Sequence, residues 1–109
     1  MNLNFEALEV DVVHHMPSED GVYVKETRIP KGVTLLMHTH TFTHKSILTK
    51  GRVSLTQGGN RRQVIAPEIL TLEKGTPHSV TALEDSVWLC VHATTETNPE
   101  LIDYAITEA

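Results

Sequence analysis

The sequence predicts an all-β fold, either a sandwich or a barrel, on three observations. Around nine short segments rich in β-branched and other apolar residues follow one another along a chain of 109 residues. Glycine, proline, asparagine or aspartate stands between most neighbouring segments, and these residues favour turns. No long segment with helical periodicity lies between the short ones. Short strands at close, regular spacing are typical of sandwiches and barrels.

The expected strands can be placed in chain order from their alternation and from the turns that bound them. Residues 1–10 are compatible with a helical turn or an edge strand, and residues 10–14 alternate only weakly. The clearer strands are expected at residues 21–29, 33–40, 45–49, 53–57, 62–66, 68–73, 78–83 and 86–94. The paired glycines Gly58 and Gly59 predict a tight hairpin, because such turns need positive φ angles.

The end of the chain has a different pattern. Asn98 is a good helix N-cap, Pro99 suits the first helical position, and Glu100 complements the positive end of a helix dipole. An apolar stripe at helical spacing follows, made of Leu101, Ile102, Ala105 and Ile106. We therefore expect one domain, residues 1–109, that closes with a short helix at about residues 98–107.

Both faces of the expected strand 33–40 carry apolar residues. Leu36 shares a face with His38, whereas Leu35 and Met37 point the other way. A strand with two apolar faces is covered on both sides, here by the barrel interior and by a second layer or a partner subunit. This pattern predicts a homodimer with Leu35 and Met37 facing outward.

Charge and composition exclude several partners. The net charge is −5 and Arg61-Arg62 is the only adjacent basic pair, so no basic stripe is available for nucleic acid. No apolar run approaches the roughly twenty residues that cross a membrane, and the first residues do not resemble a secretion signal. We expect a cytoplasmic protein. The single cysteine, Cys90, lies in an apolar run and is expected to be a buried small hydrophobic residue.

Seven histidines are the composition's one anomaly. His38 and His40 are separated by one residue, so on a strand they project from the same face, close enough to share a metal ion. His44 follows after three more residues and can join them if the chain turns or keeps the same parity. Histidine is the commonest metal ligand, and a metal site is therefore the leading hypothesis for this segment.

The spacing of this segment resembles the first motif of the cupin superfamily. Gly32, His38, His40, His44 and Gly51 all match, although most cupins have a glutamate at the position of His44.

The second cupin motif is partly kept. Gly75 and His78 match it, whereas Glu73 replaces its first proline. The resemblance covers about residues 20–94.

The resemblance implies a double-stranded β-helix, the jelly-roll cupin barrel, with one divalent transition metal inside. Its ligands would be His38, His40 and His78, with His44 in the fourth position. Four neutral imidazoles leave a divalent ion near +2, a stronger Lewis acid than the usual site with one carboxylate. Imidazole suits most such ions, so Fe, Mn, Ni, Cu and Zn all stay open.

The function that follows is a metal-dependent oxygenase or other oxidoreductase acting on a small organic substrate. Two alternatives stay open: a non-catalytic ligand-binding or accessory cupin, and a metal-assisted isomerase or lyase for a sugar-like substrate. No catalytic residue can be assigned. Glu73 is expected to be an exposed charge, His14 and His15 surface residues, and His92 a hydrogen-bonded, partly buried side chain that could also line the mouth of the barrel.

Overall fold

The computed structural model describes residues 10–37 and 44–94. These residues form nine strands and no helix, which confirms the all-β prediction. The strands are β1 (Asp11–His15), β2 (Val22–Ile29), β3 (Thr34–Met37), β4 (His44–Lys50), β5 (Arg52–Gln57), β6 (Asn60–Ile65), β7 (Glu68–Leu72), β8 (His78–Ala82) and β9 (Ser86–Ala93). The expected helix at residues 98–107 lies outside the described residues.

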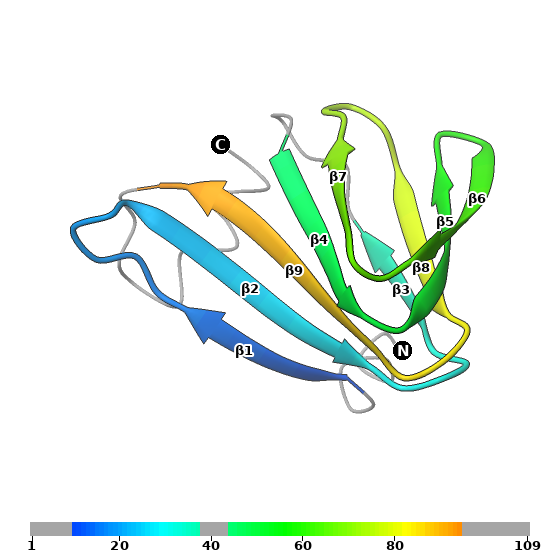
Figure 1. Cartoon of the computed structure of the whole chain (residues 1–109). Coiled ribbons are helices and arrows are strands. Elements are labelled where there is room, and N and C mark those ends of the chain that lie inside the picture. The colour runs from blue at the N-terminus through cyan, green and yellow to red at the C-terminus, as the bar shows by residue number, and fades with distance from the viewer. Residues whose placement is uncertain (1–9, 38–43, 95–109) are drawn as a thin grey trace, which may run out of the picture.

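The strands form two antiparallel sheets that face each other (Figure 1). One sheet has the order β1-β2-β9-β4-β7 and the other the order β3-β8-β5-β6. The chain crosses from the first sheet to the second at Gly51, where β4 leads directly into β5. The predicted hairpin joins β5 to β6, and its glycines have φ angles of 57° at Gly58 and 100° at Gly59.

The hydrophobic core lies between the inner faces of the two sheets. Along β4, β8 and β9 every second side chain is buried or turned inward, as expected of strands with one face on a core. The most completely buried apolar side chains are Tyr23, Ile29, Leu48, Val53, Leu55, Val64, Leu72, Val80, Ala82 and Trp88. Burying one such large side chain stabilises the fold by about 1.5–3 kcal/mol. The core fixes which residues of each strand face inward.

Strand β3 is oriented opposite to the prediction. Leu35 pairs with the buried Val80 and packs against the core, while Leu36 is 66% exposed. Two adjacent leucines give no periodicity that distinguishes the two faces, and the pairing with β8 decides between them. The prediction that Leu35 faces outward is therefore wrong.

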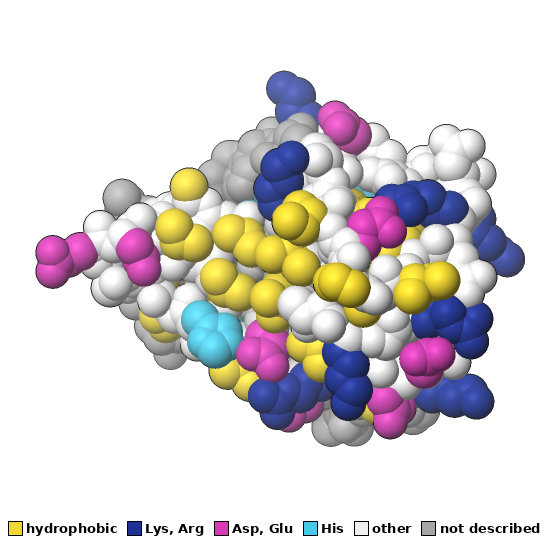
Figure 2. Space-filling view, viewed as in Figure 1, with side chains coloured by type: hydrophobic (Ala, Val, Ile, Leu, Met, Phe, Trp, Pro, Cys, Tyr) yellow, Lys and Arg dark blue, Asp and Glu magenta, His cyan; other side chains and the backbone are white. Residues whose placement is uncertain are grey.

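A different apolar surface lies on the outside of the five-stranded sheet. Figure 2 shows hydrophobic side chains gathered over β2, β9 and β4. Ile69 on β7 is 69% exposed, and Ile47, Leu89 and Val91 are partly exposed at outward positions of β4 and β9. The homodimer stays a prediction, and it no longer rests on Leu35.

In the part of the chain that the structure describes, no helix is long and apolar enough to cross a bilayer.

Candidate metal centre

Buried histidines gather where several strands begin or end on one side of the barrel. His44 is the first residue of β4, His78 is the first residue of β8, and His92 is the last but one residue of β9. Their exposed fractions are 6%, 4% and 2%. Together with Cys90, these three residues define what we call the histidine end.

The register of β4 and β9 brings His44 and His92 together. Lys45 pairs with Val91 and Ser46 with Cys90, so the next position along places His44 beside His92. The two imidazole rings are tilted by 32°, and their centroids are 4.4 Å apart. One ligand atom from each of His44, Cys90 and His92 can be chosen so that all three lie within 4.8 Å of one another.

Cys90 belongs to this group because it shares the inner face of β9 with His92. Residues two apart on a strand project from the same side. Cys90 is half-buried, and the hydroxyl of the fully buried Ser46 donates a hydrogen bond to its sulfur over 3.6 Å. The thiol is therefore held at the edge of the histidine pair, with its sulfur acting as an acceptor.

His78 lies on the four-stranded sheet and contacts a different partner, Gln57, on the neighbouring strand β5. Its Nε2 lies 3.4 Å from the side-chain nitrogen of Gln57, which also donates to the carbonyl of Thr71 over 3.2 Å. His78 is not part of the three-residue group with Cys90 and His92. It also lines a surface pocket of about 290 Å³, together with Leu36, Thr56, Gly58, Gly59, Pro77 and Ser79.

His38 and His40, the other two predicted ligands, lie outside the described residues. Their segment starts after Met37, which pairs with His78, and ends at His44. Their assignment as metal ligands stays a prediction.

His92 also has an aromatic contact with Tyr23 on the neighbouring strand β2. Tyr23, fully buried on β2, pairs with His92 and stacks on it with ring centroids 6.2 Å apart. The Tyr23 hydroxyl and Nδ1 of His14 are hydrogen-bonded at 2.6 Å. The exposed His14 is thereby connected through Tyr23 to the buried pair.

These residues suit a transition-metal ion. Two protonated imidazoles with centroids 4.4 Å apart would repel each other in a buried place, whereas neutral imidazoles offer lone pairs to a shared cation. With Zn–N near 2.1 Å, Zn–S near 2.3 Å and a tetrahedral arrangement, two ligand atoms on one ion lie about 3.5 Å apart. The three atoms, which lie within 4.8 Å of one another, would therefore have to move closer together to share an ion.

The other singled-out residues are at the surface. His14 and His15 are exposed and have separate partners, as predicted, with His15 Nε2 lying 3.0 Å from a carboxylate oxygen of Glu26. Hydrogen bonds from His15 and then Arg28 hold the pKa of Glu26 below its usual value. Glu73 is exposed, as expected.

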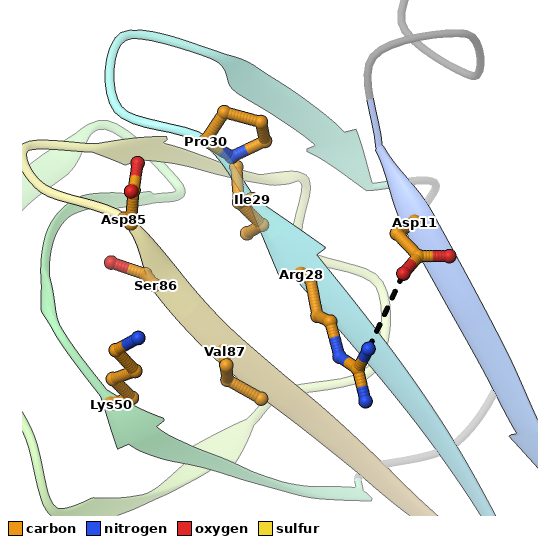
Figure 3. Close-up of a pocket in the computed structure, with 8 residues that line it drawn as sticks. All are labelled: Asp11, Arg28, Ile29, Pro30, Lys50, Asp85, Ser86 and Val87. Carbon is orange, nitrogen blue, oxygen red and sulfur yellow. Dashed lines mark hydrogen bonds and ion pairs between the residues drawn. The ribbon is translucent and has the colours of Figure 1, made fainter.

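A second pocket lies at the opposite end of the five-stranded sheet and contains no histidine (Figure 3). Its volume is about 280 Å³, and its lining includes Arg28, Lys50 and Asp85. Arg28 is already paired with Asp11 at 3.4 Å, as the dashed line in Figure 3 marks. This pocket carries no donor set for a transition metal.

Comparison with known structures identifies the fold. A cupin superfamily protein from Desulfitobacterium hafniense superposes with a TM-score of 0.69 and 12% identity, over 86% of this chain and 91% of that one. A predicted oxalate decarboxylase from Thermotoga maritima gives 0.65 and 17%, over 75% and 77%. Salicylate 1,2-dioxygenase from Pseudoaminobacter salicylatoxidans gives 0.69 and 9%, over 89% of this chain but 27% of that one.

The described part of the chain therefore has a cupin fold, which confirms the predicted resemblance at the level of the fold. At the level of sequence, no protein-family model and no curated protein matches this chain.

Cys90 and His92 are the members of the histidine end that sequence reasoning did not assign as ligands. The signal was present: a cysteine and a histidine two residues apart on a strand form a local chelate, by the same geometry that was applied to His38 and His40. His92 was expected to be partly buried, and it is more fully buried than that, at 2% exposed. Its neighbour His44 lies 48 residues earlier, and only the strand register reveals that contact.

Proposed function

We propose that this protein is a metal-dependent cupin that acts on a small organic molecule as an oxygenase or another oxidoreductase. The observation that carries the proposal is the buried pair of His44 and His92, with ring centroids 4.4 Å apart, at one end of a barrel whose core is mainly apolar. Among proteins of similar fold, one is a dioxygenase and another a predicted oxalate decarboxylase, which favours small-molecule chemistry.

The ion would be a single divalent transition metal held around His44. In this proposal His78, His38 and His40 supply further ligands, as the cupin resemblance implies. When bound, the metal supplies Lewis acidity and, if it is redox-active, a place for electron transfer. The chain itself positions the imidazoles, and the fully buried Leu72, which pairs with His44 across the strands, helps to exclude bulk water.

In this proposal a small substrate binds in the surface pocket beside His78. The pocket of about 290 Å³ lined by His78 also presents Leu36 and Pro77, which offer apolar contact. Pockets near this size suit small organic molecules rather than polymers. His78 is 4% exposed and lines this pocket, which in this proposal brings a bound substrate next to a metal ligand.

Metal content tests the first part of the proposal. Protein purified without an affinity tag should carry or take up about one transition-metal ion per chain, and saturation at 100 times Kd should raise the unfolding free energy by about 2.7 kcal/mol. His44→Ala should abolish this gain. His15→Ala is the matched control, since it removes an exposed imidazole that is bonded to Glu26 and is not part of the histidine end, and it should keep the gain. Stabilisation that persists in His44→Ala would contradict the proposed site.

Oxygen consumption tests the second part. The metal-loaded protein should consume dioxygen with a small chelating substrate such as a hydroxylated aromatic acid. Turnover that continues unchanged without oxygen would instead indicate the isomerase or lyase alternative. Metal binding with no turnover across a substrate panel would favour the ligand-binding alternative.

A further inference from the structure

We propose that Cys90 is a thiolate ligand of the ion and that Cys90, His92 and His44 form a mixed nitrogen–sulfur face of the site. This inference rests on the proposed metal-binding function and goes beyond the four-histidine set. It predicts that the ion is thiophilic. Zn(II), Co(II) and Cu(I) fit such a site, whereas Mn(II) does not.

Strand geometry supports the assignment. Cys90 and His92 project from the same face of β9, and the register with β4 adds His44 beside them. A metal bound here would therefore be chelated by two residues of one strand and anchored by a third from its neighbour. Ligands on paired strands are held more rigidly than ligands on loops.

The surroundings of the sulfur also support it. Ser46 is fully buried, pairs with Cys90 across the strands, and donates its hydroxyl hydrogen to the sulfur. A donated hydrogen bond stabilises negative charge on an acceptor, and thiolate is the form of cysteine that binds metals. On binding, the thiol proton leaves to solvent while the sulfur lone pair forms the bond to the metal.

The donor set decides which metals compete. A thiolate is a soft ligand that favours Zn, Co and Cu(I), while Mn prefers carboxylate and water oxygens. Among the ions left open by histidine alone, the sulfur therefore removes Mn and disfavours the harder ions. Its negative charge also reduces the charge of a divalent site from about +2 toward +1, which the glutamate does in other cupins.

The single cysteine makes the test direct, because every thiol signal comes from Cys90. Untagged protein is titrated with Co(II), and the near-ultraviolet sulfur-to-cobalt charge-transfer band is measured together with the visible d–d bands. The wild type should show both. Cys90→Ser should lose the charge-transfer band and bind cobalt about 100-fold or more weakly, since even outer-shell partners of a ligand are worth about 10- to 100-fold.

A second measurement requires no variant. One equivalent of Zn(II) should slow alkylation of Cys90 by iodoacetamide at least tenfold, as measured by mass spectrometry, because a zinc-bound sulfur is a poor nucleophile. This result remains decisive if Cys90→Ser fails to fold. Equal volumes of buffer and of Mg(II), a hard ion, provide the controls.

Two outcomes would overturn the inference, and they differ in what they imply. Stoichiometric cobalt binding without a charge-transfer band, combined with unchanged alkylation, would exclude Cys90 as a ligand and leave the proposed metal-dependent function intact. Absence of cobalt and zinc binding would overturn the inference, and if Fe, Mn, Ni and Cu also fail to bind, the proposed function is overturned as well.

Discussion

The two ends of the barrel are built from different interactions. At the histidine end, the buried imidazoles of His44 and His92 contact each other beside the half-buried thiol of Cys90, and the buried His78 lies on the other sheet. At the other end, around Gly51, backbone groups contact one another: the nitrogen of Leu83 donates to the carbonyl of Arg52 over 2.8 Å, and that of Ala66 donates to the carbonyl of Gly51 over 3.0 Å. We call this second region the turn end.

The difference indicates that the turn end contributes mainly to the stability of the fold and the histidine end mainly to chemistry. The turn end is closely packed around Gly51 and holds its polar groups in local hydrogen bonds, such as that from the Ser86 hydroxyl to the carbonyl of Glu84 at 2.7 Å. The histidine end instead places titratable side chains among apolar ones. Burying such groups costs free energy, and groups of this kind cluster at functional sites. Changes at the turn end should therefore affect folding, and changes at the histidine end should affect binding.

The largest expected effect is at Gly51. Its φ angle is +91°, and a β-carbon there would lie 2.3 Å from the Ser86 hydroxyl oxygen and 2.5 Å from the Asp85 carbonyl oxygen. Gly51→Ala should lower the unfolding free energy by about 3 kcal/mol or more, because it combines backbone strain with overpacking. Urea denaturation measures the change.

Gly32→Ala is the matched control for this clash. Gly32 has nearly the same φ angle, +89°, but nothing lies within 4 Å of its added carbon. Gly32→Ala should lower the unfolding free energy by about 1 kcal/mol, the cost of backbone strain without a steric clash. Equal losses in the two variants would show that close packing at the turn end contributes nothing beyond φ.

The fold was largely predictable because its signals are local. Alternation and glycine turns placed the clearer strands close to their observed bounds, as with residues 86–94 against β9, Ser86–Ala93. The orientation of β3 was not predictable, since Leu35 and Leu36 are equally apolar and pairing across the sheet decides which is buried.

The candidate site was only partly predictable, for a related reason. His44 and His78 are buried, as ligands inside a barrel must be. The partner of His44 is His92, and that contact depends on how β4 registers with β9. Cys90 was interpreted as a packing residue because its neighbours in sequence are apolar. Sequence periodicity describes one strand at a time, whereas a metal site is assembled across strands.

A moderate effect is expected where the histidine end meets the surface. Tyr23→Phe removes the hydroxyl that is hydrogen-bonded to His14 at 2.6 Å but keeps the ring stacked on His92. The unfolding free energy should fall by about 1 kcal/mol, the usual worth of one hydrogen bond. Cobalt affinity should change less than in Cys90→Ser.

A double-mutant cycle isolates this contact. Combining Tyr23→Phe with His14→Ala should cost little more than either change alone, because each removes the same hydrogen bond. Additive losses would mean that the two residues stabilise the fold independently, and the proposed connection from surface to site would be wrong.

The smallest effect concerns Glu26, which is on the solvent-exposed side of the five-stranded sheet and belongs to neither end. Its pKa is held below the usual 4.5 by hydrogen bonds from His15 and then Arg28. A carboxyl whose folded pKa is lowered contributes stability that is present above its unfolded pKa and is lost as the pH falls through its folded pKa. The advantage of the wild type over Glu26→Gln in thermal midpoint should thus shrink from about pH 5 downward, by an amount that solvent screening keeps small.

His15→Gln, which removes the first cause of the shift, should reproduce part of this change, and metal affinity at neutral pH should be the same in all three proteins. A difference between wild type and Glu26→Gln that grows with acidification would contradict the direction of the pKa shift.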